Sequence, residues 1–140
     1  MMKVLSLVLL LIWSLTTLAQ DIYTDAEAAN KARSLFKDAY ALHAKVDEVC
    51  DDASATGLLY EAAEDALQKL HGWPDQKSQA LASYDSCRQS MVDVQSYAYT
   101  CAQDGYKGKA VTYMQRRWAE DTTSCDEAIR ASGLSGRVRN

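Results

Sequence analysis

The sequence has little of what a turn-rich or β-rich protein needs. One proline and six glycines occur among 140 residues, whereas alanine, leucine, lysine and glutamate, which favour helices, occur throughout. No two cysteines have C-x-x-C spacing, and the two histidines, His43 and His71, lie far apart, which argues against a structural zinc site. The sequence also lacks an Asn-x-Ser/Thr sequon, so we expect no N-glycosylation. We therefore expect an all-α protein without metal or cofactor.

The chain is also short of positive charge. Fifteen lysines and arginines stand against 19 acidic residues, a net charge of −4. An acidic protein is a poor candidate for binding nucleic acid or an anionic membrane. The cluster of Arg130, Arg137 and Arg139 is interpreted as a solvated tail.

The N-terminal segment has the pattern of a secretory signal peptide. A basic residue, Lys3, precedes the apolar run Val4–Trp13, and small residues follow as far as Ala19. The apolar run is too short to span a bilayer comfortably. We expect cleavage after Ala19, so that residues 1–19 are a signal peptide and residues 20–140 form a single secreted domain, with no membrane attachment after cleavage.

Apolar residues recur at steps of three and four and predict helices with one buried stripe each. The stripes are Ala28, Ala32, Leu35, Ala39, Leu42, Val46 and Val49; Ala53, Leu59, Ala63, Leu67 and Leu70; Leu81, Tyr84, Cys87, Met91, Val94, Ala98 and Cys101; and Val111, Met114, Trp118, Cys125 and Ile129.

The first helix begins at a capping box formed by Thr24 and Glu27 and extends to about Cys50. The segment "DDASATG" at 51–57 is rich in residues that favour caps and turns, but the apolar phase continues across it. Residues 24–71 are therefore either two helices or one long bent helix. A break is favoured, because an unbroken helix would be roughly 70 Å long.

Gly72, at a C′ position, and Pro74 predict the end of that segment. A further helix is expected from about Asp75 to Gln103, and a last one from Lys109 to Ser132, closed by Gly133. Three to four amphipathic helices with short connections predict an antiparallel up-and-down helical bundle.

Four cysteines in an oxidising compartment predict two disulfides. In a hairpin whose turn centres near residue 106, Cys87 and Cys125 are equally far from the turn and should be bonded. Cys101 faces position 111, which is not a cysteine. Folding back around residue 73 brings Cys101 near Cys50, so we expect Cys50–Cys101 as the second bond. The other two pairings would require bonds that span a helix length.

The helical hairpin resembles the C-terminal part of the plant invertase and pectin methylesterase inhibitor domain family. The matching residues are Cys87, Met91, Asp93 and Val94 on one helix, and Ala119, Asp121, Thr123, Ser124, Cys125, Asp126 and Glu127 on the next. The family's N-terminal hairpin and last helix are not matched. The family bonds its two hairpin cysteines to each other, which agrees with a Cys87–Cys125 disulfide. The resemblance implies inhibition of pectin methylesterase or acid invertase, both cell-wall carbohydrate-active enzymes.

The tyrosines suggest where a protein partner would bind. Tyr97, Tyr99, Tyr106 and Tyr113 gather around the turn of the hairpin, with Lys107 and Lys109 between them. Tyrosine is favoured at protein interfaces. We take Tyr106, Lys107, Lys109 and Tyr99 as candidate partner-binding residues; alternatively, Tyr97 and Tyr113 cover the end of the bundle. Trp73 and Trp118 are expected in the core or at its boundary.

No combination of residues predicts an active site, since a nucleophile needs a nearby base. His71 is interpreted as facing carbonyl groups at a helix end, and His43 as a satisfied histidine beside the buried stripe. The acidic pairs Asp51–Asp52 and Asp126–Glu127 are interpreted as caps and solvated faces. We therefore expect a secreted non-enzymatic inhibitor. The alternatives are a carrier of small apolar ligands, of the odorant-binding type, and a secreted effector.

Overall fold

The computed structural model describes residues 23–74, 78–104 and 109–137. The described residues contain helices and no strand: α1 (Asp25–Val49), the 3₁₀ helix η1 (Ala53–Ala55), α2 (Thr56–His71), α3 (Gln79–Ala82), α4 (Asp85–Asp104) and α5 (Lys109–Arg137). The predicted signal peptide, residues 1–19, lies outside the described residues, as does the predicted start of the mature chain.

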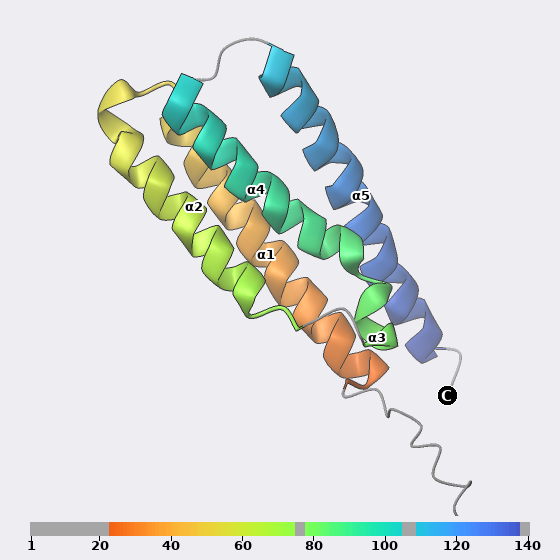
Figure 1. The fold of residues 1–140 in the computed structure, drawn as a ribbon. Helices are drawn as coiled ribbons and strands as arrows, with labels where there is room; N and C mark the ends of the chain where they lie inside the picture. The colour runs from red at the N-terminus through yellow and green to blue at the C-terminus, as the bar shows by residue number, and fades with distance from the viewer. Residues whose placement is uncertain (1–22, 75–77, 105–108, 138–140) are drawn as a thin grey trace, which may run out of the picture.

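The four long helices form an antiparallel up-and-down bundle, as predicted (Figure 1). α4 packs against α1, α2 and α5, and α2 and α5 lie on opposite sides of the α1–α4 pair. α1 and α4 run in the same direction, yet they contact each other more extensively than α1 contacts α2 or α5. Small buried residues on α1, among them Ala28, Ala32 and Ala39, allow this close approach.

The first helix ends where the cap-rich segment begins, which confirms the break. The Thr24–Glu27 capping box closes the N-terminus of α1. At its other end, Asp52 Oδ1 accepts hydrogen bonds from the backbone N–H of Ser54 (2.9 Å) and from its hydroxyl (2.6 Å), which starts η1. Ala53 is therefore exposed, contrary to the predicted stripe, and Ala55 is buried instead.

Three other helix boundaries differ from the prediction. The helix expected from Asp75 to Gln103 is two helices, because tight turns with Tyr84 N–H donating to the Leu81 carbonyl (2.9 Å) separate α3 from α4. Gly133 does not end the last helix, which continues to Arg137, although a glycine inside a helix costs about 1 kcal/mol relative to alanine. Gly72 caps α2 in a right-handed conformation (φ −74°) and lies in the C-cap position itself.

Both predicted disulfides are present. Cys50–Cys101 joins the ends of α1 and α4, with the Cα atoms 5.0 Å apart, and Cys87–Cys125 joins α4 to α5, with the Cα atoms 4.7 Å apart. Each bond lies within a buried cluster at one end of the bundle, and a third cluster around Met91 and Val94 fills the middle. All seven residues of the predicted α3–α4 stripe, from Leu81 to Cys101, are buried. The opposite ends of α4 are thus fixed to two different neighbours.

Candidate functional site

Three aromatic rings from three helices meet on one side of the bundle. His43 of α1 stacks on Trp118 of α5, with ring centroids 4.1 Å apart and an interplanar angle of 10°. Tyr97 of α4 lies 5.1 Å from the His43 ring at an angle of 26°. His43 is therefore held by packing, in agreement with its interpretation as a satisfied residue beside the buried stripe.

Asp47, one turn after His43, connects two of these side chains. Its Oδ2 lies 3.3 Å from His43 Nδ1, and its Oδ1 accepts a hydrogen bond of 2.6 Å from the Tyr97 hydroxyl. Burial lowers the pKa of His43, and the negative charge of Asp47 opposes this effect. His43 is therefore neutral at neutral pH.

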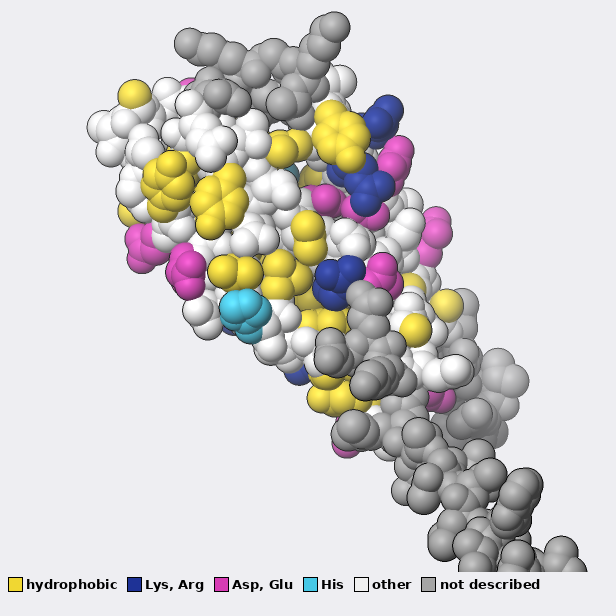
Figure 2. All heavy atoms as spheres, in the orientation of Figure 1, with side chains coloured by type: hydrophobic (Ala, Val, Ile, Leu, Met, Phe, Trp, Pro, Cys, Tyr) yellow, Lys and Arg dark blue, Asp and Glu magenta, His cyan; other side chains and the backbone are white. Residues whose placement is uncertain are grey.

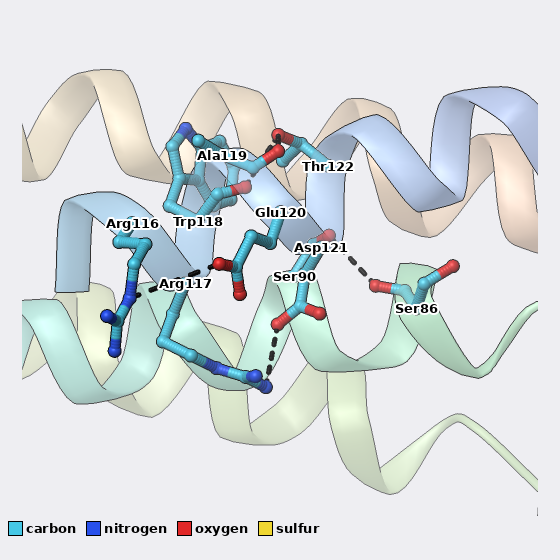
Figure 3. A network of polar contacts seen from close by, with 9 residues as sticks. All are labelled: Ser86, Ser90, Arg116, Arg117, Trp118, Ala119, Glu120, Asp121 and Thr122. Carbon is cyan, nitrogen blue, oxygen red and sulfur yellow. Dashed lines mark hydrogen bonds and ion pairs between the residues drawn. The ribbon is translucent and has the colours of Figure 1, made fainter. Parts of the chain in front are cut away.

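A pair of acidic residues lies beside the rings, between α4 and α5. Asp93 Oδ2 is buried and has no hydrogen-bond partner among the described residues. On α5, Arg117 donates a hydrogen bond of 3.1 Å to Asp121, four residues later (Figure 3). Burial raises the pKa of Asp93 to about 7; a hydrogen bond with Asp121 and its negative charge act in the same direction, and Arg117 opposes them. Asp93 therefore retains a proton at mildly acidic pH.

The other polar side chains in this region are satisfied within their own helices. The Thr122 hydroxyl donates to the Trp118 carbonyl (2.6 Å), and the Ser90 hydroxyl donates to the Ser86 carbonyl (2.9 Å) (Figure 3). Arg116 lies 4.0 Å from Glu120 along the exposed side of α5. Among the described residues of this interface, the Oδ2 atom of Asp93 is therefore the exception.

Two small cavities are lined by described residues. One, of about 110 Å³, lies beside the rings and is lined by His43, Asp47, Asp93, Tyr97, Met114, Gln115 and Trp118. The other, of about 240 Å³, lies between α1 and α2 and is lined by Lys31, Ser34, Leu35, Asp38, Gln68, Lys69, Gly72 and Trp73. Both are smaller than the roughly 300 Å³ at which pockets for drug-sized ligands begin. In the described part of the chain, no three His, Cys, Asp or Glu residues are grouped so as to hold a metal ion.

Of the four candidate partner-binding residues, the structure describes the side chain of Tyr99. Its ring is exposed and meets Tyr60 of α2, which is also exposed, edge to face with centroids 6.0 Å apart. Tyr106 and Lys107 lie outside the described residues; Lys109 begins α5, and its side chain is not described.

The remaining predicted residues divide between core and surface. Tyr97 is buried, whereas Tyr113 is exposed with the Arg116 guanidinium 5.5 Å from its ring centre, so the two do not act as a joint cover. Trp73 and Trp118 are half-buried, as expected of boundary residues. His71 is exposed.

Sequence reasoning missed two features of this surface. Tyr60 follows the buried Leu59 directly, a position that a helical pattern assigns to the flank of the stripe. Asp93 lies between the stripe residues Met91 and Val94, which could have marked it as half-buried. The acidic pairs behave as interpreted: Asp52 is a cap, and Asp126 pairs with Arg130 at 2.9 Å on the surface.

Comparisons with known proteins add no relative. No family model matches the chain, and neither the curated proteins nor the solved structures contain a match.

Proposed function

We propose that this chain is a secreted, non-enzymatic protein that acts by binding another protein, and that its target is a cell-wall carbohydrate-active enzyme. The observation that carries the proposal is the exposed Tyr60–Tyr99 pair on a frame closed by two disulfides. Large aromatic side chains on a rigid scaffold lose little conformational entropy on binding, and tyrosine is enriched at binding hot spots.

Secretion is supported by the disulfides as well as by the N-terminal signal. Two disulfides and no free cysteine among the described residues suit an oxidising compartment. None of the described helices is both long and apolar enough to cross a lipid bilayer.

Pectin methylesterase and acid invertase are proposed as targets because of the resemblance of the α4–α5 hairpin to the inhibitor family. The Cys87–Cys125 bond closes that hairpin, which is the bond expected from the resemblance. The test therefore includes both enzymes.

The direct test mixes the mature protein with purified pectin methylesterases and acid invertases at mildly acidic pH. Binding is measured by calorimetry, and residual enzyme activity is measured in parallel. We expect a complex with at least one enzyme, weakened by Tyr99→Ala and unchanged by the matched surface variant Tyr113→Ala. The absence of binding to every enzyme tested would overturn the proposed target class.

Neither of the two cavities that the described residues line is large enough for a drug-sized ligand, which in this part of the chain favours binding at the surface over transport of an apolar ligand. The carrier alternative makes an opposite prediction, which a second assay examines. A hydrophobic fluorescent probe should not be taken up by the protein and then displaced by small apolar compounds; such displacement would favour the carrier.

A further inference from the structure

The outer face of α2 carries three acidic residues without a counter-charge. Glu61, Glu64 and Asp65 are exposed and form no ion pair with any described residue. The positive residue of this helix, Lys69, pairs instead with Asp38 of α1 at 3.1 Å. We call Glu61, Glu64 and Asp65 the acidic ridge.

The charged residues of α5 differ from those of α2 because several of them form ion pairs within the helix. Arg116, Arg117 and Arg130 each pair with an acidic residue four positions away, so three of the acidic residues of that helix have a counter-charge within it. Exposed acidic residues without an ion pair also occur elsewhere, for example Glu48 and Glu127, but on α2 three of them lie together on the outer side of one helix.

The acidic ridge weakens the helix that carries it. Glu61 and Asp65 are four positions apart, and Glu61 and Glu64 are three apart, so like charges are neighbours on the helix surface. All three lie in the middle of α2, too far from its N-terminus to gain from the helix dipole. Within α2, Gln68 donates a hydrogen bond of 2.9 Å to Glu64, and Lys69 lies four positions after Asp65, so the repulsion is partly offset. A bound cationic group would offset it further.

Apolar side chains flank the acidic ridge. Tyr60, 46% exposed, lies on the side of α2 that faces α4, where it meets Tyr99, 36% exposed. Leu58, 56% exposed, comes two positions before Tyr60 and so projects on the other side of the ridge. Figure 2 shows hydrophobic groups side by side over the upper parts of α2 and α4, with acidic side chains next to them.

We propose that this α2–α4 face, the acidic ridge with Tyr60 and Tyr99, is the docking surface for a basic segment of the partner protein. The inference rests on the proposed function, that the chain acts by binding a protein, and adds where the partner binds and what chemistry it presents. An arginine side chain suits both parts of the face. Its guanidinium pairs with carboxylates through two hydrogen bonds and also stacks on tyrosine rings.

The test uses a short synthetic peptide rich in arginine and leucine. Its counterpart, in which each arginine is replaced by citrulline, keeps the shape and removes the charge. The isotope-labelled protein is titrated with each peptide at low salt and followed by NMR. We expect the arginine peptide to shift resonances of α2 and of the Tyr99 region of α4, and the citrulline peptide to bind at least tenfold more weakly.

Charge-matched variants separate a specific site from general attraction. The acidic-ridge variant carries Glu61→Gln, Glu64→Gln and Asp65→Asn. The control carries Glu48→Gln, Asp51→Asn and Glu127→Gln, three exposed positions that also form no ion pair with described residues. The ridge variant should lose at least tenfold in affinity and the control less than twofold, with thermal melts showing that both remain folded.

Two results would overturn the inference. The first is an equal loss of peptide affinity in both variants, which would mean that net charge alone causes binding. The second is a set of resonance shifts spread over the whole surface. The docking surface and the proposed enzyme targets can be supported or refuted independently of each other. Site-selective peptide binding without any enzyme complex would support the docking surface and refute those targets. An enzyme complex that the ridge variant forms as tightly as the wild type would refute the docking surface alone.

Discussion

Replacing Asp93 by asparagine should stabilise the protein, and the gain should grow as the pH rises from about 4 to 7. The pKa of Asp93 is raised from its ordinary value of 3.8 to about 7, so the folded protein holds this proton more tightly than the unfolded chain does. Folding stability therefore falls as the pH rises from about 4 to 7, and the full cost is present above pH 7. Asparagine has the same shape, carries no charge and can donate a hydrogen bond to Asp121.

The size of the effect follows from the difference in pKa. About three pKa units correspond to about 4 kcal/mol. Because Asp93 is only partly buried, solvent screening reduces this cost, and we expect about 2 kcal/mol. For a domain of this size, such a change raises the melting temperature by roughly 8 °C.

Urea unfolding followed by circular dichroism, with the disulfides intact, measures the difference at pH 8 and at pH 4.5. Asp93→Asn should exceed the wild type by about 2 kcal/mol at pH 8 and by about 1 kcal/mol or less at pH 4.5, which is still slightly above the ordinary pKa of 3.8. His43 contributes equally to both proteins and cancels. Asp126→Asn, which breaks an exposed ion pair with Arg130, serves as the control and should change stability by less than about 1 kcal/mol at either pH. A variant less stable than the wild type at pH 8, or a difference that is the same at both pH values, would refute the reasoning.

Three further variants test which contacts stabilise the helical bundle. Replacing Cys50 and Cys101 together by alanine opens a loop of 51 residues and should cost about 4 kcal/mol in urea unfolding; no change would mean that the bond closes a loop already ordered in the unfolded chain. Tyr97→Phe removes a buried hydroxyl that donates to Asp47, and should cost about 1 kcal/mol in the same assay. Met91→Ala, at a fully buried position in the middle cluster, should lower stability by about 3 kcal/mol, and a loss below 1 kcal/mol would show that the core collapses around the gap.

The helices and their pairing could be predicted because they depend on local periodicity and on chain length. The buried stripes follow from spacing alone, and equal distances from the hairpin turn select Cys87–Cys125. The close contact of α1 with α4 could not be derived in this way. It depends on how near two helices of the same direction can approach, which alanines such as Ala32 and Ala39 permit but do not require. The exposed Tyr60–Tyr99 pair needs α2 and α4 to be neighbours, which the fold-back around residue 73 predicts, and it also needs a register between them that the spacing does not give.

The Asp93–Asp121 pair shows how much of the candidate site can be predicted from the register of the α4–α5 hairpin. Reflection about the same turn that pairs Cys87 with Cys125 places Asp93 opposite residue 119, within one helical turn of Asp121. Register therefore brings the two carboxyl groups to the same level of the bundle, but it does not fix the rotation of α5 about its own axis. That rotation is fixed by the Cys87–Cys125 bond, which turns the side of α5 that carries Cys125 towards α4, and Asp121, four positions before Cys125, lies on the same side. The proximity of the two carboxyl groups therefore follows from the hairpin and its disulfide, whereas the burial that is the main cause of the raised pKa of Asp93 does not.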